Sequence, residues 1–217
     1  MSKLSALEKT LWTINDDSKI DSSSIIEKLK SELQQHHINM YNAWEESGFD
    51  INANSFNGSN LLCLASGSGC TKVVELLIEK EADVNVRDNE GKAPLHLAVI
   101  IPGQNTYIAK VLLDKGAEIN IQDNEGRTPL HLAVSTSGQS IQIAEMLLNK
   151  GAEVDIQDNE GKTPLDYAIS NEREEVIEIL TGKILLSDEG LTSQMSSEQE
   201  VEIDSQYETL PSYPFFF

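Results

Sequence analysis

The amino-acid sequence predicts an all-α solenoid, in which short helical units stack on one another instead of closing around a single core. One stretch, Asp-Asn-Glu-Gly-(Lys/Arg)-(Ala/Thr)-Pro-Leu, occurs three times, at residues 88–95, 123–130 and 158–165. Successive copies begin 35 residues apart. A fixed period of this length is typical of stacked repeats. Each unit of such a stack packs only on its neighbours, so no closed globular core is needed.

Each copy predicts a tight turn followed by a helix. The glycine of the stretch supplies the backbone freedom that the turn needs. Thr128 and Thr163 lie where a helix N-cap belongs, and each precedes a proline at the first helical position. Ala93 replaces the capping threonine in the first of the three copies. We therefore expect the helix after Ala93 to begin less firmly, by about 1 kcal/mol.

A second apolar helix is predicted after each turn and first helix. Residues 108–113 and 143–148 are the clearest examples, with the sequences Ile-Ala-Lys-Val-Leu-Leu and Ile-Ala-Glu-Met-Leu-Leu. Lys115-Gly116 and Lys150-Gly151 follow these segments. A glycine after a helix that ends in lysine is a C-cap pattern. Each unit is therefore expected to be a turn and two helices.

Taken together, these motifs resemble the ankyrin repeat, with its Gly-x-Thr-Pro-Leu-His-x-Ala and Leu-Leu-x-x-Gly-Ala-x-Val-Asn patterns. The resemblance covers roughly residues 22–183. It implies units of about 33 residues, each a helix pair with a projecting finger. It also implies that His96 and His131 form hydrogen bonds between neighbouring fingers, a structural role. Neither histidine has a nucleophile, base or metal ligand beside it in sequence.

In chain order, the pattern predicts units that end in a cap on each side. Leu4, Leu7 and Leu11 have the spacing of an amphipathic helix, and Ser24 to Glu27 has the form of a capping box. The expected segments are an N-terminal helix (1–21), a degenerate N-terminal capping repeat (22–54), ankyrin repeats (55–86, 87–121 and 122–156), a C-terminal capping repeat (157–186) and a disordered acidic, aromatic tail (187–217).

Some positions depart from the repeat pattern. Asn60 stands where threonine is expected and is still able to cap a helix. Glu81 replaces the glycine that ends the second helix, so a strained or altered turn is expected there. The next two units carry extra residues between their helices, within 100–105 and 135–140.

Composition limits the classes of function. The chain has 16 basic and 36 acidic residues, a net charge of −20, which argues against binding nucleic acid or anionic lipid. Cys63 and Cys70 are too few for a disulfide framework or a zinc site and are expected to be buried thiols. No apolar run suggests a signal peptide or membrane span. We expect a monomer without cofactor or metal, in the cytoplasm of its own cell or of a host cell.

For function, the resemblance implies protein–protein recognition through finger tips and the concave side of the first helices, without catalysis. Phe56, Ile100 and Ile101 depart from the other units in being apolar, which suggests a binding hot spot; the alternative is that they fill the solenoid. The candidate protein-binding residues are Phe56, Asn89, Glu90, Lys92, Ile100, Ile101, Asn124, Glu125, Arg127, Ser135, Thr136, Asn159, Glu160 and Lys162.

The specific role has two interpretations. The first is an adaptor or effector; the second is a regulatory inhibitor similar to those of the Rel family, with residues 188–193 as a degradation signal. An enzyme would need a constellation that forms only in space. The tail raises its own hypothesis: Tyr207, Tyr213, Phe215 and Phe217 form an aromatic peptide ligand. A fold-back onto the concave face, a secretion signal and drift of an unconstrained segment are the alternatives for the tail.

Overall fold

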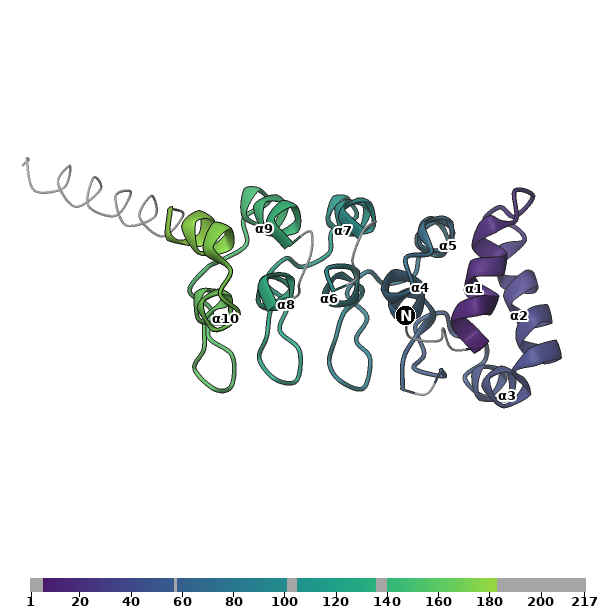
Figure 1. The fold of residues 1–217 in the computed structure, drawn as a ribbon. Coiled ribbons are helices and arrows are strands. Elements are labelled where there is room, and N and C mark those ends of the chain that lie inside the picture. Colours follow the sequence, from purple (N-terminus) through teal and green to yellow (C-terminus); the bar gives the residue numbers. More distant parts are fainter. Residues whose placement is uncertain (1–5, 57, 101–104, 136–139, 183–217) are drawn as a thin grey trace, which may run out of the picture.

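The computed structural model describes residues 6–56, 58–100, 105–135 and 140–182 as an elongated stack of helices (Figure 1). Within these ranges the only β-structure is an isolated bridge between Phe56 and Ser59. Residues 174–182 are also helical. The other helices are α1 (Ala6–Asp16), α2 (Ile25–His36), α3 (Ile38–Glu46), α4 (Leu61–Gly67), α5 (Thr71–Glu79), α6 (Pro94–Ala98), α7 (Asn105–Asp114), α8 (Pro129–Ser135), α9 (Ser140–Asn149) and α10 (Pro164–Ser170).

The helices form two parallel rows, with a third row of finger-like loops beside them (Figure 1). Helices α4, α6, α8 and α10 make the inner row, next to the fingers, and each contacts the following one. Helices α5, α7 and α9 make the outer row. The predicted all-α solenoid is therefore confirmed for the described residues. Ile101, Thr136 and the tail residues Tyr207, Tyr213, Phe215 and Phe217 lie outside the described residues.

Polar ladders join successive units along this stack. In the loops that follow α3, α5 and α7, an asparagine side chain accepts a hydrogen bond from a backbone N–H of the next unit. These bonds lie at the exposed surface of the loops, so each replaces a hydrogen bond to water. The three such bonds are Asp83 N to Asn52 Oδ1 (2.9 Å), Glu118 N to Asn85 Oδ1 (2.8 Å) and Glu153 N to Asn120 Oδ1 (3.0 Å).

Three helices close the N-terminal end of the stack. Helices α1 and α2 run across the direction of the later helices (Figure 1), and both contact α5. Leu11 and Ile14 of α1 and Leu29 of α2 are fully buried. Asn15 Oδ1 also accepts a hydrogen bond from the backbone N–H of Lys72 on α5, at 2.9 Å. The cover of the α4–α5 unit therefore includes the N-terminal helix as well as residues 22–54.

The predicted capping box at Ser24 is wrong. Ser24 makes no side-chain cap bond, because its own backbone is already helical (φ −105°, ψ −15°). Asp21 organises the turn instead: its Oδ1 accepts from the backbone N–H groups of Ser23 and Ser24, both at 3.0 Å. Hydrogen bonds, led by the Ser23 hydroxyl, lower the pKa of Asp21 to about 2. Glu27 pairs with Lys30 at 3.0 Å rather than reaching back.

The expected departures at Asn60 and Glu81 are confirmed. Asn60 Oδ1 accepts from the backbone N–H of Cys63 at 2.8 Å and so caps α4. Glu81 has a left-handed backbone (φ +62°), which favours glycine. The strain is retained because it preserves the helix-ending bond from Ala82 N to Leu77 O, at 3.0 Å.

Candidate functional site

The finger tips are joined to one another by asparagines. Asn124 donates its backbone N–H to Glu90 O and its side-chain amide to Asn89 O, both at 3.0 Å. Asn159 repeats the arrangement one unit later, reaching Glu125 O at 2.9 Å and Asn124 O at 3.0 Å. The asparagine side chains are exposed, but their amides are engaged. These candidate binding residues therefore hold the row of fingers together.

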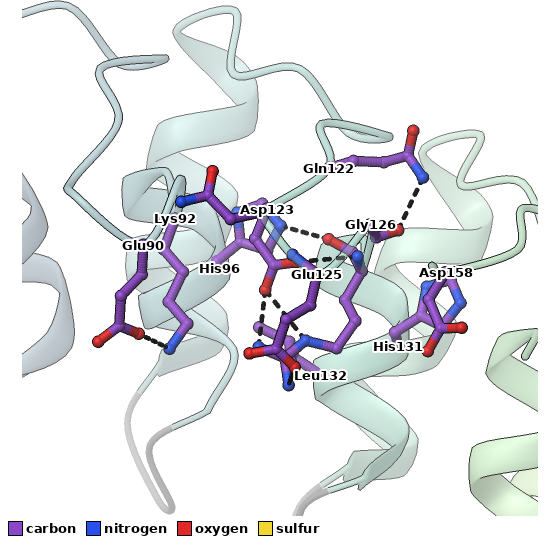
Figure 2. Close-up of polar contacts among 12 residues, drawn as sticks. Glu90, Lys92, His96, Gln122, Asp123, Glu125, Gly126, His131, Leu132 and Asp158 are labelled. Atoms are coloured by element: carbon purple, nitrogen blue, oxygen red, sulfur yellow. Dashed lines mark hydrogen bonds and ion pairs between the residues drawn. The ribbon is translucent and has the colours of Figure 1, made fainter. Parts of the chain in front are cut away.

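An aspartate anchors the turn of the three charged fingers, and it is buried in two of them, as Asp123 and Asp158. Asp123 Oδ1 accepts from the backbone N–H groups of Glu125 and Arg127, both at 2.9 Å. Its Oδ2 accepts from Arg127 Nε and Nη2 at 3.0 and 2.8 Å (Figure 2). Burial raises the pKa of Asp123, but the hydrogen bonds and charge of Arg127 outweigh it and leave the pKa lowered. Arg127 is thus held inside its own finger.

Three of the fingers also present one glutamate each to solvent. The side chains of Glu90, Glu125 and Glu160 are 71%, 68% and 71% exposed. Each pairs with the basic residue of its own finger: Lys92 lies 2.5 Å from Glu90 (Figure 2), and Lys162 lies 2.8 Å from Glu160. Exposed pairs of this kind contribute about 0–1 kcal/mol to stability. The charged tips therefore repeat a surface that is compensated finger by finger.

His96 and His131 connect the fingers to the inner helices, as expected. His96 Nδ1 accepts from Ala93 N at 3.1 Å, which leaves Nε2–H to donate to Arg127 O at 2.9 Å. His131 makes the same pair of bonds, and its Nε2 lies 3.1 Å from Lys162 O. Both rings are buried. Acceptance at Nδ1 and donation from Nε2 together require the neutral Nε2–H tautomer.

Cys63 takes the place of this histidine in the unit of α4 and α5. Its Sγ lies 3.5 Å from Lys92 O, the carbonyl equivalent to those that accept from His96 and His131. Burial raises the pKa of Cys63 to about 12, so the thiol keeps the proton that it donates. Asp166 occupies the same position in the last unit. Its carboxylate accepts from the backbone N–H and hydroxyl of Thr163, both at 2.8 Å.

A row of apolar side chains at equivalent positions runs along the inner helices, one from each. We call Leu64, Leu97, Leu132 and Tyr167 the inner-helix row. Leu64, Leu97 and Tyr167 are half-buried, and Leu132 is 7% exposed. The Tyr167 hydroxyl donates to Asp158 Oδ2 at 2.6 Å, which fixes the ring. Sequence patterns missed this row, because its residues alternate with core leucines on the same short helices.

Comparison with known families decides the assignment. A model of ankyrin repeats, in three copies, matches residues 25–123 and 101–188. The chain belongs to the ankyrin-repeat family. Ankyrin repeats are protein-interaction modules, and their usual mode of action is binding rather than catalysis. No curated protein matches the chain significantly.

The prediction that Phe56 belongs to an exposed binding hot spot is wrong. Phe56 is only 2% exposed, and its ring centroid lies 5.8 Å from that of Trp44. The bridge with Ser59 turns the first finger so that Phe56 packs on the N-terminal helices instead of standing at the tip. Ile100 is half-buried and packs against the core. Ser135 is half-buried, and its hydroxyl donates to Leu132 O at 2.9 Å.

The described part of the chain has a surface pocket but no candidate metal site or membrane-spanning helix. No group of three or more His, Cys, Asp or Glu side chains there could hold a metal ion. None of the helices in those ranges is long and apolar enough to cross a membrane. A hollow of about 300 Å³ lies between α9 and the last helix, lined by Ile141, Val176 and four charged side chains (Glu172, Arg173, Glu174 and Glu175). It contains no histidine, cysteine or serine.

The junction histidines are expected to make the stacking of the repeats sensitive to acid. Burial lowers the pKa of both His96 and His131. Below about pH 6.5 the unfolded chain therefore binds more protons than the folded chain. The free energy of unfolding decreases as the pH is lowered. We expect urea titrations from pH 8 to pH 5.5 to show this loss, with a shallower slope in the His96→Gln/His131→Gln double variant.

The single variants His96→Gln and His131→Gln are the controls for this measurement, because each keeps one buried ring. Their slopes should lie between those of the parent and the double variant. An unchanged slope in the double variant would show that carboxylates, and not the junction histidines, control stability in this range. A folded-state pKa that is lower by one corresponds to a loss of about 1.4 kcal/mol in the free energy of unfolding at low pH.

Proposed function

We propose that this ankyrin-repeat chain is a non-enzymatic adaptor or effector that binds another protein through its inner-helix row and finger tips. The observation that carries the proposal is the row itself. Three of the four successive inner helices each offer one half-buried apolar side chain, and three of the neighbouring fingers have charged tips. A central apolar strip with a polar rim is the arrangement of a protein interface.

The contacts within the fingers suggest how binding energy is divided. The finger asparagines already bond to neighbouring fingers, and Arg127 is held by Asp123. These groups have little left to offer a partner. Leu97 and Ile100 gain from losing their remaining contact with water, at about 25 cal/mol per Å². The exposed glutamates are better suited to orienting the partner and setting the association rate.

Net charge adds a preference for the partner. The chain carries −20, and three finger tips each display an accessible glutamate (Glu90, Glu125 and Glu160). Such a surface attracts proteins with basic patches and repels acidic ones, most strongly at low salt. Binding to a basic partner should therefore weaken as salt is raised.

The test isolates the partner by affinity purification and mass spectrometry, then measures its affinity for variants. Leu97→Ser and Ile100→Ser should each weaken binding by about tenfold, which corresponds to 1.4 kcal/mol. Glu90→Lys, on an exposed side chain, should slow association without affecting the fold. The matched control is Ile38→Ser, because Ile38 is 51% exposed on α3, away from the row.

Melting temperatures separate lost binding from lost folding. If Leu97→Ser and Ile100→Ser both melt like the parent and bind like the parent, neither the inner-helix row nor the neighbouring Ile100 is the interface. If both unfold, Glu90→Lys decides: unchanged association kinetics would place the partner elsewhere on the molecule.

A further inference from the structure

The last described unit leaves open an apolar face that earlier units cover. Ile169 on α10 is 53% exposed, whereas Val99 and Val134, at the equivalent positions of α6 and α8, are 1% and 0% exposed. Leu165 is half-buried, whereas its equivalent Leu130 is 1% exposed. The difference arises because α6 and α8 are each followed by another inner helix (Figure 1). The side of α10 that would meet the next unit is therefore uncovered by described residues.

The finger of this unit is open in the same direction. Glu125 O accepts a hydrogen bond from Asn159 N at 2.9 Å, but the equivalent Glu160 O accepts none from any described residue. The surroundings of two equivalent glycines, Gly126 and Gly161, show the same opening. A Cβ built on Gly126 would lie 2.6 Å from the Asn159 side chain, whereas one on Gly161 would have nothing within 4 Å.

Charge and hydrogen-bonding capacity define what fits this face. Asp166 replaces the histidine that donates across earlier junctions, and a carboxylate only accepts. Residues 151–182 hold nine acidic side chains against two basic ones, Lys162 and Arg173. Lys162 is paired with Glu160 within its own finger. The face therefore combines exposed aliphatic surface with acceptors and negative charge.

A second copy of the protein and residues 187–217 of the same chain are both disfavoured as occupants of this face. A second copy meeting the same end would place acceptors against acceptors and negative charge against negative charge. The opposite end of a second copy is covered by α1, α2 and α3 (Figure 1). Residues 187–217 carry seven acidic and no basic side chains, so they share the charge of the face.

We propose that the end of the stack formed by Leu165, Ile169 and the carbonyls of Asn159 and Glu160 is a second docking surface, distinct from the inner-helix row. We call it the C-terminal end face. Its occupant is a basic segment of another protein, with an aliphatic side chain that packs on Ile169. Lysine, arginine or amide groups of that segment donate to the open carbonyls and neighbouring carboxylates, as the asparagine of a next finger would.

The probe for this surface is a displayed random-peptide library selected on the full chain. Selected peptides should carry net positive charge and at least one Ile, Leu or Val. A synthetic copy of the leading peptide should bind Ile169→Lys at least tenfold more weakly than the parent. The matched control is Ile38→Lys, because Ile38 is 51% exposed at the opposite end of the stack. That variant should bind like the parent.

Two further variants keep the result decisive. Glu160→Lys alters a 71% exposed side chain, so it should weaken the peptide without unfolding the chain, even if Ile169→Lys does not fold. Glu90→Lys, on a central finger, should leave the peptide's affinity unchanged. Failure to select basic peptides, full binding to both end-face variants, or loss of binding only in Glu90→Lys would each overturn the proposal. The last result would leave the inner-helix row intact as an interface.

Discussion

Replacing Trp44 with alanine is expected to lower the free energy of unfolding by about 3–5 kcal/mol. Trp44 is fully buried at the N-terminal end of the solenoid. Its ring packs edge-on against Phe49, at 5.4 Å between centroids, and against Phe56 at 5.8 Å. Its Nε1–H donates to Asp50 O at 2.8 Å. Alanine would leave a cavity and also an acceptor without its partner.

Urea unfolding followed by circular dichroism measures this effect. Phe56→Ala should also lose about 3 kcal/mol, because Phe56 is buried in the same cluster. Trp12→Ala is the comparison, since Trp12 is half-buried on α1 and should lose less. A Phe56→Ala variant as stable as the parent would contradict the packing of this ring and restore the idea of an exposed anchor.

The repeat architecture was predictable because its signals are local. Threonine before proline, glycine in a positive-φ turn and lysine before glycine each specify one piece of backbone within a few residues. Repetition at a fixed period then implies stacking, since an isolated unit would leave its apolar face in water. The expected bonds of His96 and His131 followed from the family resemblance, and the structure confirms both.

The errors occurred where distant residues compete with local patterns. Phe56 aligns with polar residues at other finger tips, but Trp44 of the preceding segment gives it a buried contact. Ser24 has the spacing of a capping box, yet Asp21 captures the backbone N–H of the same turn. Neither competitor is visible from the motif alone, because the geometry of the chain entering the helix decides between them.

The candidate site was predictable only in part. Sequence alone placed the charged tips correctly at the surface, where Glu90, Glu125 and Glu160 are exposed. It did not reveal that Asn124 and Asn159 use their amides to join fingers. Nor did it separate Leu97 from the core leucines beside it. Burial on a helix of five residues depends on the crossing of neighbouring helices, which the sequence pattern does not encode.

Gly126→Ala is expected to lower the free energy of unfolding by about 3–4 kcal/mol, the sum of backbone strain and lost junction hydrogen bonds. Gly126 has φ +79°, and its added Cβ would lie 2.6 Å from Asn159 Oδ1 and 2.8 Å from Asn159 N. The next finger must move away, which breaks the bonds that Asn159 makes to Glu125 O and Asn124 O.

Gly161→Ala is the internal control for this substitution. Gly161 has almost the same backbone (φ +78°), but nothing lies within 4 Å of its added Cβ. Gly161→Ala should therefore lower the free energy of unfolding by the backbone strain alone, about 1–2 kcal/mol. The difference between the two variants in urea titrations measures what contact between fingers contributes at one junction. Equal losses would mean that the fingers separate at little cost, and that packing of the helix rows alone holds neighbouring units together.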